Sequence, residues 1–316
     1  MTQQPLSKDP IEVIPVNSIL RKSRWRWRTI AFAALAIAIL ALIGRFGGDN
    51  LKQDSNQIAR VIINDVIFTN RSRLNIINKL ADDENVKAVI IAINSPGGTT
   101  AGGEEIYEAI MALREEKPVV AVIHEVGASA AYMSAIASDQ IFARRLSIVG
   151  SIGVLFQHMN MGKLFDTIGL DFDKVQSGPL KAEPDIDEPL EGAARISLQE
   201  LVDDSYNWFV DIVSKRRNIS RIKTLELADG RILTGRMALE AGLIDAIGSE
   251  VEAIKWLEET KEIEKDLEVI TRFPLPKDNF EKFIDDLGSK ITSSIGIKSN
   301  PATLDGLVSV WQTGSN

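Results

Sequence analysis

The sequence predicts an α/β fold built on a mainly parallel sheet. Between residues 58 and 156, short apolar runs that suit buried strands alternate with stretches whose apolar residues recur at helical spacing. Val86–Asn94 (VKAVIIAIN) is one such run, and the helical stretch Ala101–Glu115 follows it directly. Strands that alternate with helices in this way form parallel sheets with right-handed crossovers.

The same patterns give the expected elements in chain order. We expect strands at Arg60–Phe68, Val86–Asn94, Val119–Val126, Ile141–Ala143 and Ile148–Phe156. We expect helices at Arg71–Ala81, Ala101–Glu115, Ala128–Ser138, Ala193–Arg217, Thr234–Ala241 and Val251–Thr260. The pattern weakens after residue 261, where Asn279–Ser294 could form an amphipathic helix.

Composition excludes several classes of function. The chain has no cysteine, so disulfides and thiolate chemistry are excluded, and its two histidines are His124 and His158. Residues 1–28 hold six of the 36 Lys and Arg but only two of the 44 Asp and Glu. The rest of the chain is therefore strongly acidic, which argues against nucleic acid as a partner because binding there depends on neutralising phosphates.

The basic N-terminal residues precede an uncharged apolar segment at 30–43. We expect a transmembrane anchor at 29–48, with 1–28 as a cytoplasmic tail, because positive residues stay on the cytoplasmic side. A cleaved signal peptide is the alternative, but the leader is long and Arg45 and Phe46 stand where a cleavage site would be. Residues 49–57 then form a polar linker, 58–260 the main domain and 261–316 a C-terminal extension.

Two glycine- or serine-bearing clusters follow predicted strands. In Asn94–Gly98 (NSPGG), two glycines allow a sharp turn and expose N–H groups, although an ordinary strand-to-helix turn explains the pattern equally simply. In Gly127–Tyr132 (GASAAY), Ser129 stands between a strand and a helix. There it is either a helix N-cap or a nucleophile whose next N–H, that of Ala130, faces a developing oxyanion.

Two further clusters lie downstream. Gly150–Gly153 (GSIG) taken alone is a glycine-flanked strand or bulge. Lys181 lies in the loop Ser177–Pro184 (SGPLKAEP), where a lysine is normally a solvated charge. A lysine shielded from water loses its proton more easily, however, and can then act as a general base.

Together and in this order, the four clusters resemble those of the signal peptide peptidase A family of Ser-Lys proteases. The resemblance covers about residues 58–260 and includes GRILTGRMALEAGLIDAIG at Gly230–Gly248. It implies the Clp protease and crotonase-like fold, a sheet of repeated ββα units with helices outside.

The resemblance also implies a role for particular residues. Ser129 aligns with the nucleophile, Lys181 with the general base and Ser151 with a serine that orients the lysine. The N–H groups of Gly98 and Ala130 would form the oxyanion hole. Alanine stands at positions 130 and 131, where the family usually has two glycines, and this puts substrate specificity in question more than activity. No metal or cofactor is implied.

The expected partners and location follow from the same resemblance. They are peptide substrates such as remnant signal peptides and membrane protein fragments, and further copies of the chain in a homo-oligomer, with Ser129 and Lys181 acting within one subunit or across two. The location would be the bacterial inner membrane, with one span, the N-terminus in the cytoplasm and the catalytic domain in the periplasm.

Three other functions remain open at this point. A Clp-type Ser-His-Asp site needs a histidine, but His124 is only five residues before Ser129 on the same predicted strand. A crotonase-like acyl-CoA enzyme would use a similar oxyanion site, although an exported body argues against a CoA substrate. The third is a catalytically inactive or partner-dependent membrane scaffold of the same fold.

Overall fold

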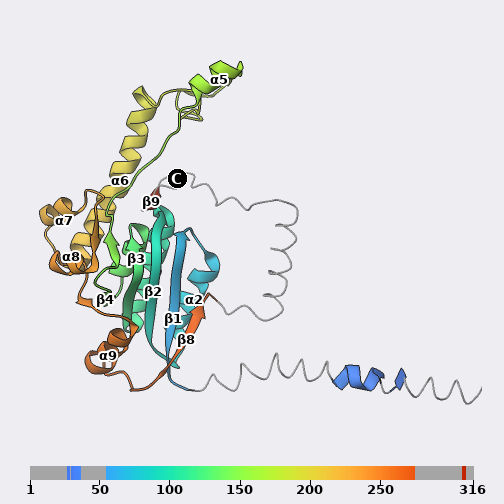
Figure 1. The fold of residues 1–316 in the computed structure, drawn as a ribbon, viewed down its shortest axis with the longest axis vertical. Coiled ribbons are helices and arrows are strands. Elements are labelled where there is room, and N and C mark those ends of the chain that lie inside the picture. Colours follow the sequence, from blue (N-terminus) through green and yellow to red (C-terminus); the bar gives the residue numbers. More distant parts are fainter. Residues whose placement is uncertain (1–26, 29, 37–54, 275–307, 311–316) are drawn as a thin grey trace, which may run out of the picture. The chain divides into compact units, whose positions relative to one another are not determined.

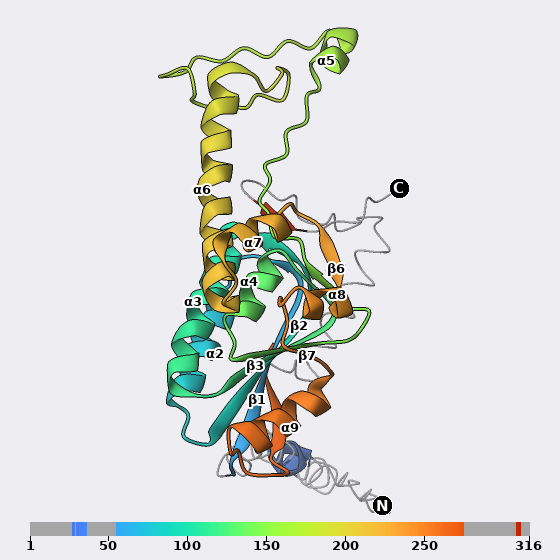
Figure 2. The ribbon, with the colours of Figure 1, turned by 90° about the vertical axis from the view of Figure 1, so that its left-hand side faces the viewer.

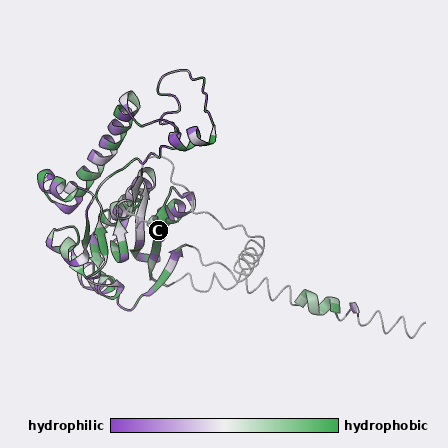
Figure 3. Cartoon of the chain, turned by 45° about the horizontal axis from the view of Figure 1, so that its top comes forward, coloured by the Kyte–Doolittle hydropathy of each residue, from purple (hydrophilic) through white to green (hydrophobic). Residues whose placement is uncertain are grey.

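The computed structural model describes residues 27, 28, 30–36, 55–274 and 308–310 (Figure 1). The chain divides into two units, Met1–Ser55 and Asn56–Asn316. In the first, residues 30–36 are helical, exposed and hydrophobic (Figure 3). Among the described residues, no helix has both the length and the apolar character needed to cross a membrane. Most of the expected anchor at 29–48, and the expected helix Asn279–Ser294, lie outside the described residues.

The described part of the second unit is built on one nine-stranded sheet, whose main path runs in the order β6-β5-β3-β2-β1-β8. Strands β1 to β5 and β8 pair in parallel, whereas β6 is antiparallel to β5 and β9 is antiparallel to β2. The mixed α/β class with a parallel sheet is therefore confirmed. The strands are β1 (Gln57–Ile67), β2 (Val86–Thr99), β3 (Val119–Ala128), β4 (Gln140–Ala143), β5 (Ile148–Gly150), β6 (Ile232–Thr234), β7 (Ala246–Ile247), β8 (Glu268–Phe273) and β9 (Val308–Val310).

Helices cover both faces of this sheet (Figure 2). They are α2 (Arg71–Asp82), α3 (Thr100–Glu116), α4 (Ala130–Ile136), α5 (Gly162–Ile168), α6 (Gly192–Arg217), α7 (Arg221–Leu227), α8 (Gly235–Glu240) and α9 (Glu250–Thr260). Side-chain caps begin several of them: the Thr99 side chain accepts from the Gly102 N–H at the start of α3, and Ser249 and Glu252 form a capping box on α9.

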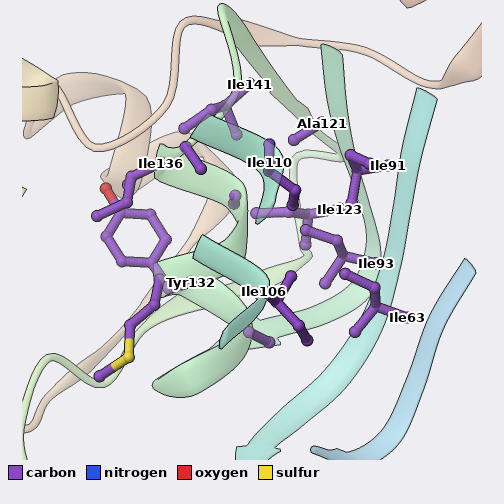
Figure 4. Close-up of a cluster of buried hydrophobic side chains, with 14 of the residues drawn as sticks. Ile63, Ile91, Ile93, Ile106, Ile110, Ala121, Ile123, Tyr132, Ile136 and Ile141 are labelled. Atoms are coloured by element: carbon purple, nitrogen blue, oxygen red, sulfur yellow. The ribbon is translucent and has the colours of Figure 1, made fainter. Parts of the chain in front are cut away.

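Alternate residues of the central strands enter two different cores. On β2, Ile91 and Ile93 pack with α2, α3, α4 and α6, while Ile90 faces α9 on the other side. Figure 4 shows the first of these cores, in which Ile106 and Ile110 of α3 meet the sheet. Burial on both faces explains why these strands are continuous apolar runs rather than alternating ones.

Two predicted boundaries were wrong. The strand expected at Ile148–Phe156 ends at Gly150, because Ser151 adopts a positive φ of 52° that an extended strand cannot accommodate. Strand β2 continues past Asn94 to Thr99, since its last residues still pair with β1. The short strand β7 begins only at Ala246, because the Leu243 N–H closes the end of α8 by bonding to the Ala238 carbonyl.

Residues 154–200 form an arm that projects from the sheet (Figures 1 and 2). The arm comprises α5, the loops around it and the start of α6, whose buried residues all lie in its C-terminal half, from Phe209 to Val213. Main-chain bonds such as Met161 N–H to the Ile186 carbonyl (2.7 Å) hold the arm's two sides together. Many of its large apolar side chains are nevertheless exposed: Leu155, Met159, Leu164, Ile168, Leu170, Phe172, Val175, Leu180, Ile186 and Ile196.

Candidate active site

Ser129 occupies the junction between β3 and α4 in an unusual conformation. Its φ of 60° and ψ of −123° are rare for a residue with a side chain, and such strain costs about 1–3 kcal/mol. The side chain is 1% exposed and makes no capping hydrogen bond to α4. Ser129 therefore occupies the N-cap position of α4, as one interpretation of the cluster expected, but its hydroxyl does not cap the helix.

The backbone of Ser129 is fixed against the strand that carries Ser151. Its N–H donates to the Gly150 carbonyl at 2.8 Å, which continues the pairing of β3 with β5. Ser151 follows directly, is 8% exposed and donates its own N–H to the Arg231 carbonyl at 2.8 Å. The structure thus brings the two predicted serines onto neighbouring strand ends, each with a positive φ.

The two predicted oxyanion donors lie on the elements next to Ser129. Ala130 is the first residue of α4, so its N–H has no acceptor within that helix. Gly98 lies on β2, where Ser95 is in register with Gly127, two residues before Ser129. A methyl group on Gly98 would be 1.9 Å from the Ile67 carbonyl oxygen, so only glycine fits this approach to β1.

Gly103 brings α3 close to the start of α4, a packing role that the sequence did not reveal. A Cβ on Gly103 would lie 3.0 Å from the Ala130 Cβ and 2.7 Å from the Met133 sulfur. This close packing fixes Ala130 relative to the residues that follow Gly98. The pair Gly102 and Gly103 near the start of a predicted helix was the signal for this contact, because helices normally disfavour glycine.

Lys181 stands apart from this group, in the arm. Its side chain is exposed, and its N–H closes a turn by donating to the Gly178 carbonyl at 3.0 Å. Ala182 follows with a φ of 75°.

A second lysine of the arm, Lys174, is tied to carboxylates. Its ammonium donates to Glu183 at 2.8 Å and also to Asp185. The bond to Asp185 and then the bond to Glu183 raise the pKa of Lys174, which keeps this amine protonated. Lys174 is therefore unsuited to act as a base, and its ion pairs instead close the loop that carries Lys181.

The glycine-rich stretch Gly230–Gly248 supports the strands around the site. It supplies the Arg231 carbonyl that holds Ser151, and the Asp245 carboxylate accepts from the Ile141 N–H at 2.7 Å. Arg217 of α6 binds the same carboxylate at 2.6 Å. Asp245 thus links α6 to β4, a structural role that the sequence analysis did not assign.

Neither histidine has the surroundings of a catalytic base. His124 is half-buried on β3, five residues before Ser129 along the same strand. His158 lies in the arm, where its Nε2 is 3.0 Å from the Glu188 carbonyl oxygen.

The fold and the site together define the class of protein. A strained, buried serine sits between a parallel strand and a helix, and the first N–H of that helix lacks an intrahelical acceptor. This is the placement that hydrolases with a serine nucleophile use.

The model of peptidase family S49 matches residues 111–264. A protein named as a signal peptide peptidase SppA in Enterococcus faecium is 32% identical over 249 residues, covering 78% of this chain and 70% of that protein. The chain belongs to peptidase family S49.

Other relatives agree with this assignment. A Synechocystis protein named as a protease is 38% identical over 178 residues, covering 56% of this chain and 64% of that protein. The serine protease SPPA of Arabidopsis thaliana chloroplasts is 30% identical over 237 residues, covering 73% of this chain and 34% of that protein. The chain spans less than two thirds of the Synechocystis and Methanocaldococcus jannaschii relatives, 64% and 61% of their lengths. Among solved structures, a mutant of a membrane-bound stomatin-specific protease aligns with a TM-score of 0.46 and 16% identity, covering 71% of this chain and 99% of that one.

Proposed function

We propose that this chain is a membrane-anchored serine endopeptidase that cleaves hydrophobic peptides, remnant signal peptides among them, with Ser129 as nucleophile and Lys181 as general base. The conformation of Ser129 carries the proposal, because its positive φ holds a buried serine at the junction of β3 and α4, and backbone strain of this kind concentrates at active sites. Family membership supports it, since several relatives are named as proteases.

The proposed roles of these residues define the reaction. Ser129 Oγ attacks the peptide carbonyl, and its proton passes to the neutral Lys181 amine. The N–H groups of Ala130 and Gly98 stabilise the oxyanion, and Lys181 then protonates the departing amine. Water, activated by the same amine, releases the acyl group from Ser129. Ser151 positions the lysine.

We propose further that Lys181 serves the Ser129 of a neighbouring subunit in a homo-oligomer. Support comes from the arm, which projects from the sheet (Figure 2). Lys181 is exposed there, and many apolar side chains of the arm are uncovered. A subunit packed on the arm would bury those side chains and shield the lysine from water, which favours its neutral form.

Active-site labelling tests the peptidase proposal. A fluorophosphonate probe should label the detergent-extracted chain, and Ser129→Ala should abolish both labelling and hydrolysis of a hydrophobic fluorogenic peptide. Lys181→Ala should remove hydrolysis while leaving the melting temperature unchanged, because the exposed side chain adds little to stability. Hydrolysis above trace level by either variant would rule out the dyad.

Mixing the two inactive variants tests the exchange between subunits. In a ring where each site combines two neighbours, random assembly of equal amounts of Ser129→Ala and Lys181→Ala chains restores about a quarter of the sites. Sites contained within one subunit would stay inactive in every mixture. Co-expression of the two variants therefore separates the two arrangements.

The proposed location is the bacterial inner membrane, with one span at 29–48, the N-terminus in the cytoplasm and the body in the periplasm. The basic residues before the apolar segment support it. An alkaline phosphatase fused after residue 260 should be active in a bacterial host, whereas an inactive fusion would reverse the topology. A mature N-terminus near residue 48 would show that the anchor is cleaved.

An acyl-CoA enzyme or an inactive scaffold of the same fold remains the alternative. Either would leave the peptide uncleaved while the fold and the oligomer persist, so the labelling experiment distinguishes them from the peptidase.

A further inference from the structure

Ser95 lies where β2 departs from regular pairing with β1. Asn64 of β1 is opposite Asn94 of β2. The next pair is two residues further along β1 but three residues further along β2, at Gly97, so β2 carries one extra residue. A bulge of this kind bends its strand and re-aims the groups that follow, and bulges are frequent beside active sites. The residue that follows here is Gly98, one of the two proposed oxyanion donors.

The hydroxyl of Ser95 binds the backbone of both strands at this bulge. Ser95 is fully buried, and its hydroxyl donates to the Asp65 carbonyl of β1 while it accepts from the Gly97 N–H at 3.1 Å. The Gly97 carbonyl, at 3.4 Å, is a more distant acceptor. Both residues held in this way have a positive φ, 57° for Asp65 and 112° for Gly97, which residues with a side chain seldom adopt.

This contact bears directly on the proposed oxyanion hole. The Gly98 N–H belongs to the peptide group that joins Gly97 to Gly98, so its direction depends on the backbone of Gly97. Glycine has the greatest conformational freedom of all residues, and Pro96 before it has no N–H with which to anchor the turn. The bond from the Gly97 N–H to the Ser95 hydroxyl restrains this backbone at the residue before the donor.

Donors of an oxyanion hole are effective because they are already in place when charge develops, and a misplacement of about 1 Å can cost about 100-fold in rate. On the basis of the peptidase function above, we propose that Ser95 is a positioning residue, whose buried hydroxyl holds the Gly97 backbone so that the Gly98 N–H faces the oxyanion. Because Ser95 is fully buried, it acts through Gly97 and Gly98 rather than on the substrate.

The kinetics of a full-length Ser95→Ala chain test this role. Its kcat for the fluorogenic peptide should fall about 10- to 100-fold with KM changed by less than about twofold, because a displaced oxyanion donor weakens the transition state and not the bound substrate. A peptide aldehyde forms an adduct with Ser129 that carries an oxyanion. Its affinity should therefore fall by a similar factor.

Ser147→Ala is the matched control. Ser147 is also buried, and its hydroxyl donates to the His124 carbonyl and accepts from the Arg144 N–H at 3.0 Å. Its replacement removes the same two kinds of bond at another place, so it should lower Tm while leaving kcat and aldehyde affinity at wild-type values. Equal kcat in the wild-type and Ser95→Ala chains, or equal losses of kcat in both variants, would overturn the proposal.

A second variant covers the case in which Ser95→Ala does not fold. Ser95→Cys keeps nearly the same side-chain size, but a thiol is a weaker donor and acceptor than a hydroxyl. It should also lower kcat and aldehyde affinity. Wild-type values of both in the folded Ser95→Cys chain would contradict the positioning role.

The outcomes separate this proposal from the peptidase function on which it rests. A wild-type chain without hydrolysis would refute the peptidase, whereas equal hydrolysis by the wild-type and Ser95→Ala chains would refute the positioning role alone. Amide exchange tests the anchoring without catalysis: the Gly97 N–H should exchange faster in Ser95→Ala than in the wild type or in Ser147→Ala. Unchanged exchange would refute the anchoring by the Ser95 hydroxyl.

Discussion

Replacing Gly98 with alanine should destabilise the domain through the β1–β2 contact. The added methyl would lie 1.9 Å from the Ile67 carbonyl oxygen and 2.5 Å from the Ile67 nitrogen. Ordinary carbon–oxygen contacts are about 3.3 Å, so β1 must withdraw by more than about 1 Å where Ile67 and Gly98 are in register.

The expected cost combines two terms. Overpacking costs about 1–3 kcal/mol, and each weakened ladder hydrogen bond adds about 1 kcal/mol. We therefore expect Gly98→Ala to lower the free energy of unfolding by about 3 kcal/mol. For a domain of this size, that corresponds to a fall in Tm of about 6–12 °C.

Thermal unfolding followed by circular dichroism measures this effect. Gly178→Ala is the matched control, because a Cβ there meets nothing within 4 Å, and it should change the stability by less than about 1 kcal/mol. A Gly98→Ala chain that melts with the wild type would show that β1 yields freely at Ile67.

Further predictions concern buried and charged groups. Tyr132 is fully buried and donates its hydroxyl to the Leu243 carbonyl at 2.7 Å. Tyr132→Phe should therefore lower the free energy of unfolding, measured by denaturant titration, by about 1–2 kcal/mol. An unchanged free energy of unfolding would mean that another donor bonds to this carbonyl. Ser151→Ala should reduce kcat less than removal of Ser129, since the role proposed for Ser151 is only to position the lysine; total inactivation would indicate a direct chemical role. Lys174→Met should speed amide exchange over residues 177–185 without lowering Tm, and unchanged exchange would show that its ion pairs do not order the loop. Hydrolysis should rise toward alkaline pH because a lysine base must be neutral, and a rate following a group that titrates near pH 6.5 would contradict that base.

The central part of the fold was predictable because its strands are buried on both faces. The elements from β1 to β3 lie within a few residues of their predicted bounds, except where β2 continues to Thr99. Continuous apolar runs such as Val86–Asn94 leave little room for another interpretation. Short elements that depend on a partner strand, such as β6 and β8, gave no comparable signal and were missed.

The conformation of Ser129 was beyond the reach of the sequence. A serine before a helix is usually a cap, and only the structure gives the positive φ and the missing capping bond. The arm was missed for a different reason. Its apolar residues, among them Val175 and Leu180, are exposed in the single chain. They therefore lack the regular spacing of residues on a strand or helix that faces a core.

The projecting arm has a consequence for when the protein becomes active. In the proposed arrangement a single subunit cannot complete a catalytic site, because Ser129 and Lys181 of one chain serve different sites. Activity would then depend on concentration: while assembly is incomplete, doubling the number of copies more than doubles the number of complete sites. Gene dosage alone could therefore set the rate of hydrolysis.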